Sequence, residues 1–222
     1  MPTALVTGAS RGIGLALLAE LAARGYDAIG TARTPARTPA RAAGTLSLDL
    51  LDPASIARAA ETFGLRLLDL LVCNAGVYLD DKRTASPVSP ATLWAESFAV
   101  NVTGVFLTVE AFLPALRLSQ APRIAVISSR MGSTARAPGG SLAYRASKAA
   151  AVNLGRNLAA DLAREGIALG IYHPGWVRTD MGGKGAEIDA ETSARGLADR
   201  FAALGPATTG CFESYDGQTI PF

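Results

Sequence analysis

Cysteine and histidine are scarce in this chain of 222 residues, which has two cysteines and one histidine. Cys73 and Cys211 lie far apart and form no Cys-x-x-Cys pair, so the spacing offers no zinc site. So few cysteines favour a reducing compartment, and we expect a cytoplasmic protein in which both are small core residues. We therefore expect no bound metal.

An excess of charge of one sign is also missing, since 21 basic and 19 acidic residues leave a formal net charge of +2. That balance creates no field that would attract nucleic acid. No stretch of about 18 apolar residues is free of charge, and no basic segment opens the chain, so we expect neither a membrane span nor a secretory signal. Hydrophobic residues make up 49%, enough for a buried core, and the length favours one domain over 1–222.

The chain is rich in short apolar runs that alternate with segments of helical spacing. Strands that are apolar throughout and separated by helices predict a parallel sheet covered on both faces. We expect an α/β fold, a Rossmann-type doubly wound sheet of about seven strands. The expected strands are Thr3–Thr7, Asp27–Thr31, Thr45–Leu48, Leu67–Val72, Arg123–Ser128, Ile167–Tyr172 and Thr209–Phe212, and the expected helices are Ile13–Ala23, Pro53–Phe63, Leu93–Leu116, Leu142–Arg164 and Ala190–Ala203.

A glycine-rich loop joins the first expected strand to the first helix. Backbone N–H groups at such a turn, together with the helix dipole, bind a pyrophosphate. The glycines are spaced as Gly-x-x-x-Gly-x-Gly, which alone is a weak signal, but the position after the first strand favours a dinucleotide site. The residues expected to bind the cofactor here are Gly8, Ser10, Arg11, Gly12, Ile13 and Gly14.

The end of the second strand indicates which dinucleotide binds. An NAD site usually places an acidic residue there to bind the ribose 2′-hydroxyl, but this strand ends in Ala32-Arg33. Arg33 and Arg11 together suit a 2′-phosphate, so we expect NADP(H) rather than NAD(H). The alternative is that both are ordinary surface arginines. Asp49 and Leu50, after the third strand, are expected to flank the adenine.

Four polar residues form a candidate catalytic set. Tyr144 and Lys148 stand four apart and share one face of a predicted helix, so the ammonium can favour ionisation of the phenol. Tyr144 could then exchange a proton with a carbonyl or alcohol oxygen while a nicotinamide exchanges hydride. Ser129, at the end of a strand, would orient that oxygen, and Asn101 would anchor a water. Taken singly, each also has an ordinary reading as a cap or surface residue.

At these residues the chain resembles the short-chain dehydrogenase/reductase family, and within it the C-factor and sniffer-type carbonyl reductases. The resemblance implies that Tyr144 is the acid/base, that Lys148 also holds the nicotinamide ribose, and that the molecule is a homodimer or homotetramer. The matching motifs are Thr7-Gly8-x-x-x-Gly12-x-Gly14, Asn74-Ala75-Gly76, Asn101, Ser129, Tyr144-x-x-x-Lys148 and Pro174-Gly175 with Thr179. It further implies that Asn74, Ala75 and Gly76 line the adenosine and ribose side, and that Pro174, Gly175, Val177 and Thr179 line the nicotinamide amide.

Two features leave alternatives open. Ser129 and Tyr144 are two residues further apart than in most relatives, which makes Ser133 a minor rival for orienting the substrate. His173 stands beside a proline at a strand end, where a structural or cofactor-lining role outweighs catalysis.

We expect a small-molecule carbonyl or alcohol substrate. The segment after Met181 is short and glycine-rich, which indicates an open, shallow pocket that takes either small or bulky exposed carbonyls. The alternative is a nucleotide-binding signalling or regulatory protein of the C-factor type, with weak or no turnover. An apolar lining is expected from Tyr78, Met131, Trp176 and Met181.

Overall fold

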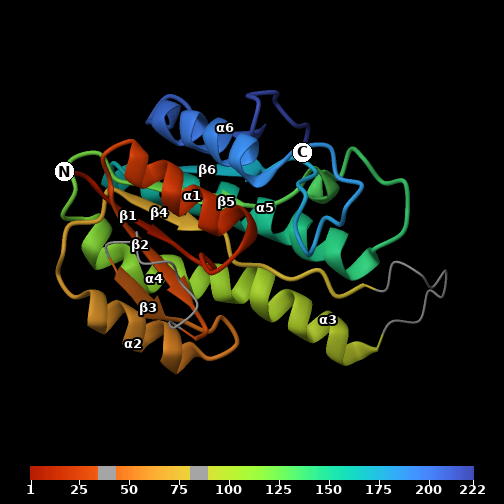
Figure 1. Ribbon diagram of the computed structural model, residues 1–222, viewed down its shortest axis with the longest axis horizontal. Helices are drawn as coiled ribbons and strands as arrows, with labels where there is room; N and C mark the ends of the chain where they lie inside the picture. Colours follow the sequence, from red (N-terminus) through yellow and green to blue (C-terminus); the bar gives the residue numbers. More distant parts are fainter. Residues whose placement is uncertain (35–43, 81–89) are drawn as a thin grey trace.

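The computed structural model describes residues 1–34, 44–80 and 90–222. Its centre is a seven-stranded sheet in the order β3-β2-β1-β4-β5-β6-β7, with every neighbouring pair parallel (Figure 1). This confirms the predicted Rossmann-type α/β fold. The strands are β1 (Thr3–Val6), β2 (Asp27–Ala32), β3 (Gly44–Ser47), β4 (Leu70–Cys73), β5 (Arg123–Ile127), β6 (Ala168–His173) and β7 (Phe212–Ser214).

Helices cover both faces of the sheet, each with its own apolar cluster (Figure 1). The helices α1 (Gly12–Ala23) and α6 (Ala190–Ala203) pack on one face. The helices α2 (Pro53–Phe63), α4 (Gly104–Leu116) and α5 (Leu142–Leu162) pack on the other, and α3 (Ala91–Phe98) precedes α4. The five inner strands β1, β2, β4, β5 and β6 are almost wholly buried, which explains why their sequences show no polar alternation.

The last strand differs from its prediction. β7 begins at Phe212, where the expected strand Thr209–Phe212 ended. Thr209 is used instead as a side-chain partner, because its hydroxyl accepts a hydrogen bond from the Leu169 N–H at 3.0 Å. A side-chain contact of this kind leaves no periodic signal in the sequence.

The prediction of one continuous helix over Leu93–Leu116 is wrong. A π-helical turn, Ala99–Thr103, separates α3 from α4 and contains Asn101. Such turns occur frequently at functional sites. By length and composition alone the segment Ala91–Leu116 could cross a membrane, but half of its most apolar window is buried inside the protein, as in a core helix.

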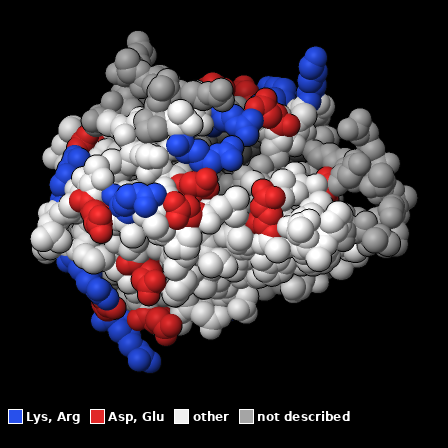
Figure 2. All heavy atoms as spheres, turned by 90° about the horizontal axis from the view of Figure 1, so that it is seen from below, with Lys and Arg blue, Asp and Glu red and all other residues white. Residues whose placement is uncertain are grey.

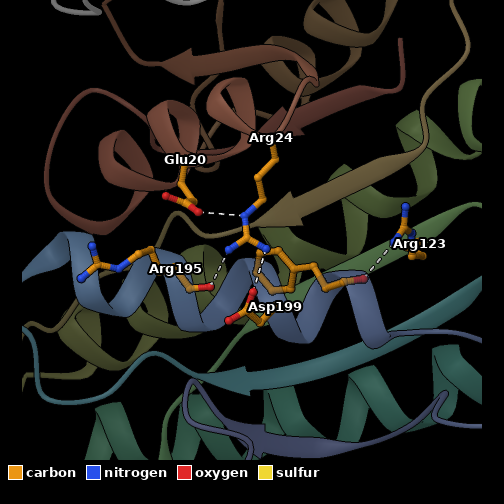
Figure 3. A network of polar contacts seen from close by, with 6 residues as sticks. Glu20, Arg24, Arg123, Arg195 and Asp199 are labelled. Carbon is orange, nitrogen blue, oxygen red and sulfur yellow. Dashed lines mark hydrogen bonds and ion pairs between the residues drawn. The ribbon is translucent and has the colours of Figure 1, made fainter.

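A polar network braces the end of the molecule opposite the glycine loop (Figure 3). Arg24, just after α1, donates to Glu20 at 2.7 Å, to Asp199 of α6 at 2.8 Å and to the Arg195 carbonyl at 3.3 Å. Arg123 of β5 donates to the carbonyl of Phe201 on α6 at 3.0 Å. The bonds of Arg24 join the end of α1 to α6, and the bond of Arg123 joins β5 to α6. On the face seen in Figure 2, basic and acidic side chains are interspersed.

Candidate active site

A cleft of about 470 Å³ opens at the carboxyl ends of the central strands. This is where the chain order of the sheet reverses, between β1 and β4, and ligands bind at such switch points in open α/β sheets. The lining includes the predicted glycine loop together with Tyr144 and Lys148, but neither Asn101 nor Ser129. It consists of Gly8, Ser10, Arg11, Gly12, Ile13, Gly14, Ala32, Arg33, Leu48, Asp49, Leu50, Leu51, Asn74, Ala75, Gly76, Val77, Glu96, Val100, Ile127, Ser128, Tyr144, Lys148, Pro174, Arg178, Thr179, Asp180 and Met181.

The glycine loop has no room for a side chain at its three glycines. Gly8 and Gly12 have φ values of +66° and +55°, in the left-handed region. A Cβ on Gly14 would lie 2.3 Å from the Gly8 carbonyl oxygen and 2.5 Å from Asn74 Nδ2. Asn74 fastens the loop to β4, since its Nδ2 donates to the Thr7 carbonyl at 2.9 Å. The loop therefore presents backbone to the cleft, as a phosphate-binding turn must.

Both arginines predicted to select NADP(H) line the cleft. Arg33 lies beside Asp49 and Leu50, in the region expected to hold the adenosine end. The Arg11 guanidinium forms an ion pair with Asp180, and more than two thirds of each side chain is exposed. An ion pair this exposed contributes little free energy, so Arg11 can leave Asp180 to bind a phosphate.

Tyr144 and Lys148 lie on the first turns of α5 and are both buried. Lys148 Nζ donates to the Ile127 carbonyl at 3.0 Å and lies 5.8 Å from the centroid of the Tyr144 ring. Burial lowers the pKa of Lys148 to about 8. A Cβ on Gly76 would come within 3.3 Å of Nζ, so glycine at this position leaves room for the ammonium.

The pKa of Tyr144 differs from the sequence-based expectation. Burial raises this pKa to about 12, against the lowering effect of a side-chain hydrogen bond with Ser129. The expectation that Lys148 lowers the pKa of the phenol is therefore wrong for the protein alone, because loss of hydration outweighs the other effects. The phenol is protonated at neutral pH and is a proton donor in this state.

Ser129 rather than Ser133 faces Tyr144. Ser129 Oγ accepts from the Met131 N–H at 3.1 Å, which fixes the side chain at the end of β5. The Ser133 hydroxyl donates to the carbonyl of Pro221 near the end of the chain. Because the Ser133 hydroxyl is used in that bond, the longer spacing between Ser129 and Tyr144 does not give Ser133 the role expected of Ser129.

The Asn101 side chain makes three hydrogen bonds to protein groups. Its Oδ1 accepts from the Val77 N–H at 2.9 Å, and its Nδ2 donates to the Val77 carbonyl and to Ser147 Oγ, both at 3.0 Å. Both N–H groups of the amide are used. A water held by Asn101 would therefore have to use its backbone carbonyl or the remaining lone pair of Oδ1.

The residues predicted to line the nicotinamide amide lie after β6, and only two of the four line the cleft. Pro174 and Thr179 line the cleft. Val177 is 3% exposed and pairs with Ile188, and Gly175 has a φ of +88° with Ile188 only 2.6 Å from the position of a Cβ. These last two shape the loop without contributing to the lining.

His173 is buried, and burial lowers its pKa to about 4. The imidazole is therefore neutral at pH 7, in line with a structural role. Within the part of the chain that the structure describes, no three His, Cys, Asp or Glu side chains gather as a metal site.

The family model for short chain dehydrogenases matches residues 2–189. The chain belongs to the short-chain dehydrogenase family. It is 38% identical to the C-signal of Myxococcus xanthus over 70% of this chain and 93% of that protein. It is 36% identical to the 3-oxoacyl-acyl-carrier-protein reductase FabG of Escherichia coli, over 80% of this chain and 74% of that protein.

Solved structures of carbonyl reductases match this short-chain dehydrogenase over its whole length. The NADPH-bound carbonyl reductase from chicken fatty liver has a TM-score of 0.88 at 30% identity, covering 100% of this chain and 99% of the other. The carbonyl reductase Sniffer of D. melanogaster has a TM-score of 0.89 at 26% identity, with 100% of both chains covered. The chain is thus an oxidoreductase by family and carbonyl-reductase-like in fold.

Sequence reasoning missed several residues of this short-chain dehydrogenase's cleft. Val77 directly follows the Asn74-Ala75-Gly76 motif and Ser128 directly precedes Ser129, so the ends of β4 and β5 were a usable signal. Glu96 and Val100 come from α3 and the π-helical turn, and only the tertiary fold brings them to the cleft. Asp80, described below, carried no signal at all.

Proposed function

We propose that this chain is an NADP(H)-dependent carbonyl reductase that transfers hydride between nicotinamide and a small-molecule carbonyl or alcohol substrate. The observation that carries the proposal is a protonated phenol, Tyr144, hydrogen-bonded to Ser129 and close to Lys148, on the same cleft as the glycine loop. A buried proton donor beside a dinucleotide-binding turn suits the reduction of a carbonyl group.

The cleft fits the cofactor. The tight backbone at Gly8, Gly12 and Gly14 leaves space for a pyrophosphate, and Arg11 and Arg33 offer guanidinium groups to a 2′-phosphate. When bound, NADPH would supply hydride to the carbonyl carbon. The remaining residues proposed to hold it are Ser10, Ile13, Asp49, Leu50, Asn74, Ala75, Gly76, Tyr144, Lys148, Pro174 and Thr179, with Gly175 and Val177 shaping the loop. Four solved neighbours contain NADP(H), which agrees with this choice.

The catalytic roles follow from the hydrogen bonds. Ser129 and Tyr144 donate to the substrate oxygen, and Tyr144 transfers its proton as charge develops there. Lys148, charged at neutral pH because its pKa is about 8, stabilises the phenolate that remains. Asn101 holds Val77 and Ser147 in place and would hold a water for proton return through its backbone.

The decisive experiment is a panel of aldehydes, ketones and quinones with NADPH, followed by Tyr144→Phe on the best substrate. Loss of the proton donor is expected to reduce kcat by about 100- to 10,000-fold while NADPH binding persists. Bound NADPH fluorescence serves as the folding and binding control. Unchanged kcat in Tyr144→Phe would show that the catalytic assignment is wrong.

A second candidate is a nucleotide-binding signalling protein with weak or no turnover, favoured by the similarity to the C-signal of Myxococcus xanthus. The same panel separates the two, because the second candidate binds NADPH and reduces the compounds weakly or not at all.

We also infer a single domain over 1–222, supported by the continuous sheet, and a homodimer or homotetramer paired through α4 and α5, where Phe106 is 38% exposed. Light scattering on the purified chain would measure its mass in solution. The low number of cysteines, both of them free thiols in the structure, supports a cytoplasmic location.

A further inference from the structure

The helix that carries Tyr144 and Lys148 begins without a cap of its own. Its N-cap residue, Ser141, makes no side-chain hydrogen bond to the first turn of α5. Two other helices are capped locally, α2 by Asp52 and α6 by Asp189. The first turn of a helix has N–H groups without partners in the helix, and leaving them unpaired costs free energy.

Asp80 supplies the missing cap from a distant part of the chain. Its Oδ1 accepts from the Ala143 N–H at 3.1 Å and its Oδ2 accepts from the Tyr144 N–H at 2.8 Å. These are the second and third residues of α5, the positions that a local cap would satisfy. The carboxylate comes from the segment after β4, more than sixty residues earlier, and it bonds directly to the backbone of Tyr144.

The same segment contacts the start of α5 at two further points. The Tyr78 ring lies against the Tyr144 ring, with centroids 4.5 Å apart, and its hydroxyl is 2.5 Å from Ser141 Oγ. Ser141 alone among the described non-glycine residues has a positive φ, +49°. A bond to its side chain helps to hold this unfavourable backbone conformation.

Asn101 ties the other end of the segment to the same helix, because its side chain bonds both Val77 and Ser147. Residues 77–80 are therefore fixed to α5 on both sides of Tyr144. The position of the Tyr144 phenol depends on these contacts, because the backbone N–H of Tyr144 donates to Asp80.

We propose that Asp80 is a positioning residue for proton transfer by Tyr144, with Tyr78 supporting it. The inference rests on the proposed function, in which Tyr144 is the proton donor. A displacement of about 1 Å at a reacting group can reduce the rate about 100-fold, so a cap that fixes Tyr144 acts on kcat rather than on cofactor binding.

The experiment compares Asp80→Ala and Asp80→Asn with wild type, using 4-nitrobenzaldehyde or 9,10-phenanthrenequinone as probe and saturating NADPH. Asp80→Ala is expected to lower kcat about tenfold or more, with the Kd for NADPH unchanged. Asp80→Asn keeps one acceptor oxygen for one of the two N–H groups, so it should recover part of that loss.

Asp52→Ala is the matched control. It removes the cap of α2, whose side chain accepts from Ala54 N–H at 2.9 Å, outside the described cleft lining. It should lower Tm about as much as Asp80→Ala does and leave kcat within about twofold. Equal kcat in Asp80→Ala and Asp52→Ala would overturn the inference.

Tyr144→Phe separates this inference from the proposed function. An inactive Tyr144→Phe beside a fully active Asp80→Ala overturns the role of Asp80 alone. Full activity in Tyr144→Phe overturns the proposed function and the role of Asp80 with it.

Discussion

The two ends of the cleft are built by different means. At the nucleotide end, the glycine loop is one short stretch between β1 and α1, and its three glycines leave no room for side chains. At the catalytic end, side chains from four separate segments meet, and hydrogen bonds between Asn101, Val77 and Ser147 hold them. The glycine loop is local in the sequence, and the catalytic end is not.

This difference decides which substitutions each end tolerates. A backbone surface is damaged by any added side chain, because the space is closed by carbonyl and amide groups that cannot move far. A side-chain network is damaged by loss of a polar group, because the buried partner is left unpaired. The two ends should therefore respond to opposite kinds of mutation.

The largest effect is expected from Gly14→Ala. Its Cβ would lie 2.3 Å from the Gly8 carbonyl oxygen, so the loop must shift and the pyrophosphate site with it. We expect NADPH affinity to fall by about 100-fold or more, which corresponds to about 2.7 kcal/mol. Fluorescence titration measures the Kd for NADPH. Gly205→Ala is the control, since a Cβ there meets open space, and an unaffected Gly14→Ala would contradict the backbone account.

A pH profile tests the catalytic end. The pKa of Lys148 is about 8, so the ammonium loses its charge as the pH rises through that value and kcat/KM for reduction should fall. In Lys148→Arg the charge persists at high pH, and the falling limb should move upward by about two pH units or more. A wild-type profile that stays flat to about pH 9.5 would show that the charge of Lys148 is not used.

The smallest effect is expected at the rim of the nucleotide end. NADPH should bind at least about tenfold more tightly than NADH, and Arg33→Ala should narrow that gap by about tenfold, or about 1.4 kcal/mol. Arg164→Ala, an exposed arginine outside the described cleft lining, is the matched control. Equal wild-type affinities for NADPH and NADH would contradict the assignment of Arg33 to a 2′-phosphate.

Much of the fold could be predicted because its strands are apolar throughout and its helices begin at recognisable signals, such as the proline that opens α2. The π-helical turn at Asn101 could not, since the sequence around it has ordinary helical spacing. The start of β7 at Phe212 could not be predicted either, because the Thr209 side chain bonds the backbone of Leu169.

The sequence by itself determined the alternation of apolar strands and helices, the glycine loop and the pairing of Tyr144 with Lys148, because each depends on residues near one another in the chain. Only the tertiary structure decided that burial raises the pKa of Tyr144, that Ser133 bonds Pro221, and that Asp80 caps α5. Those outcomes depend on hydration and on contacts across more than sixty residues. Neither is encoded in local spacing.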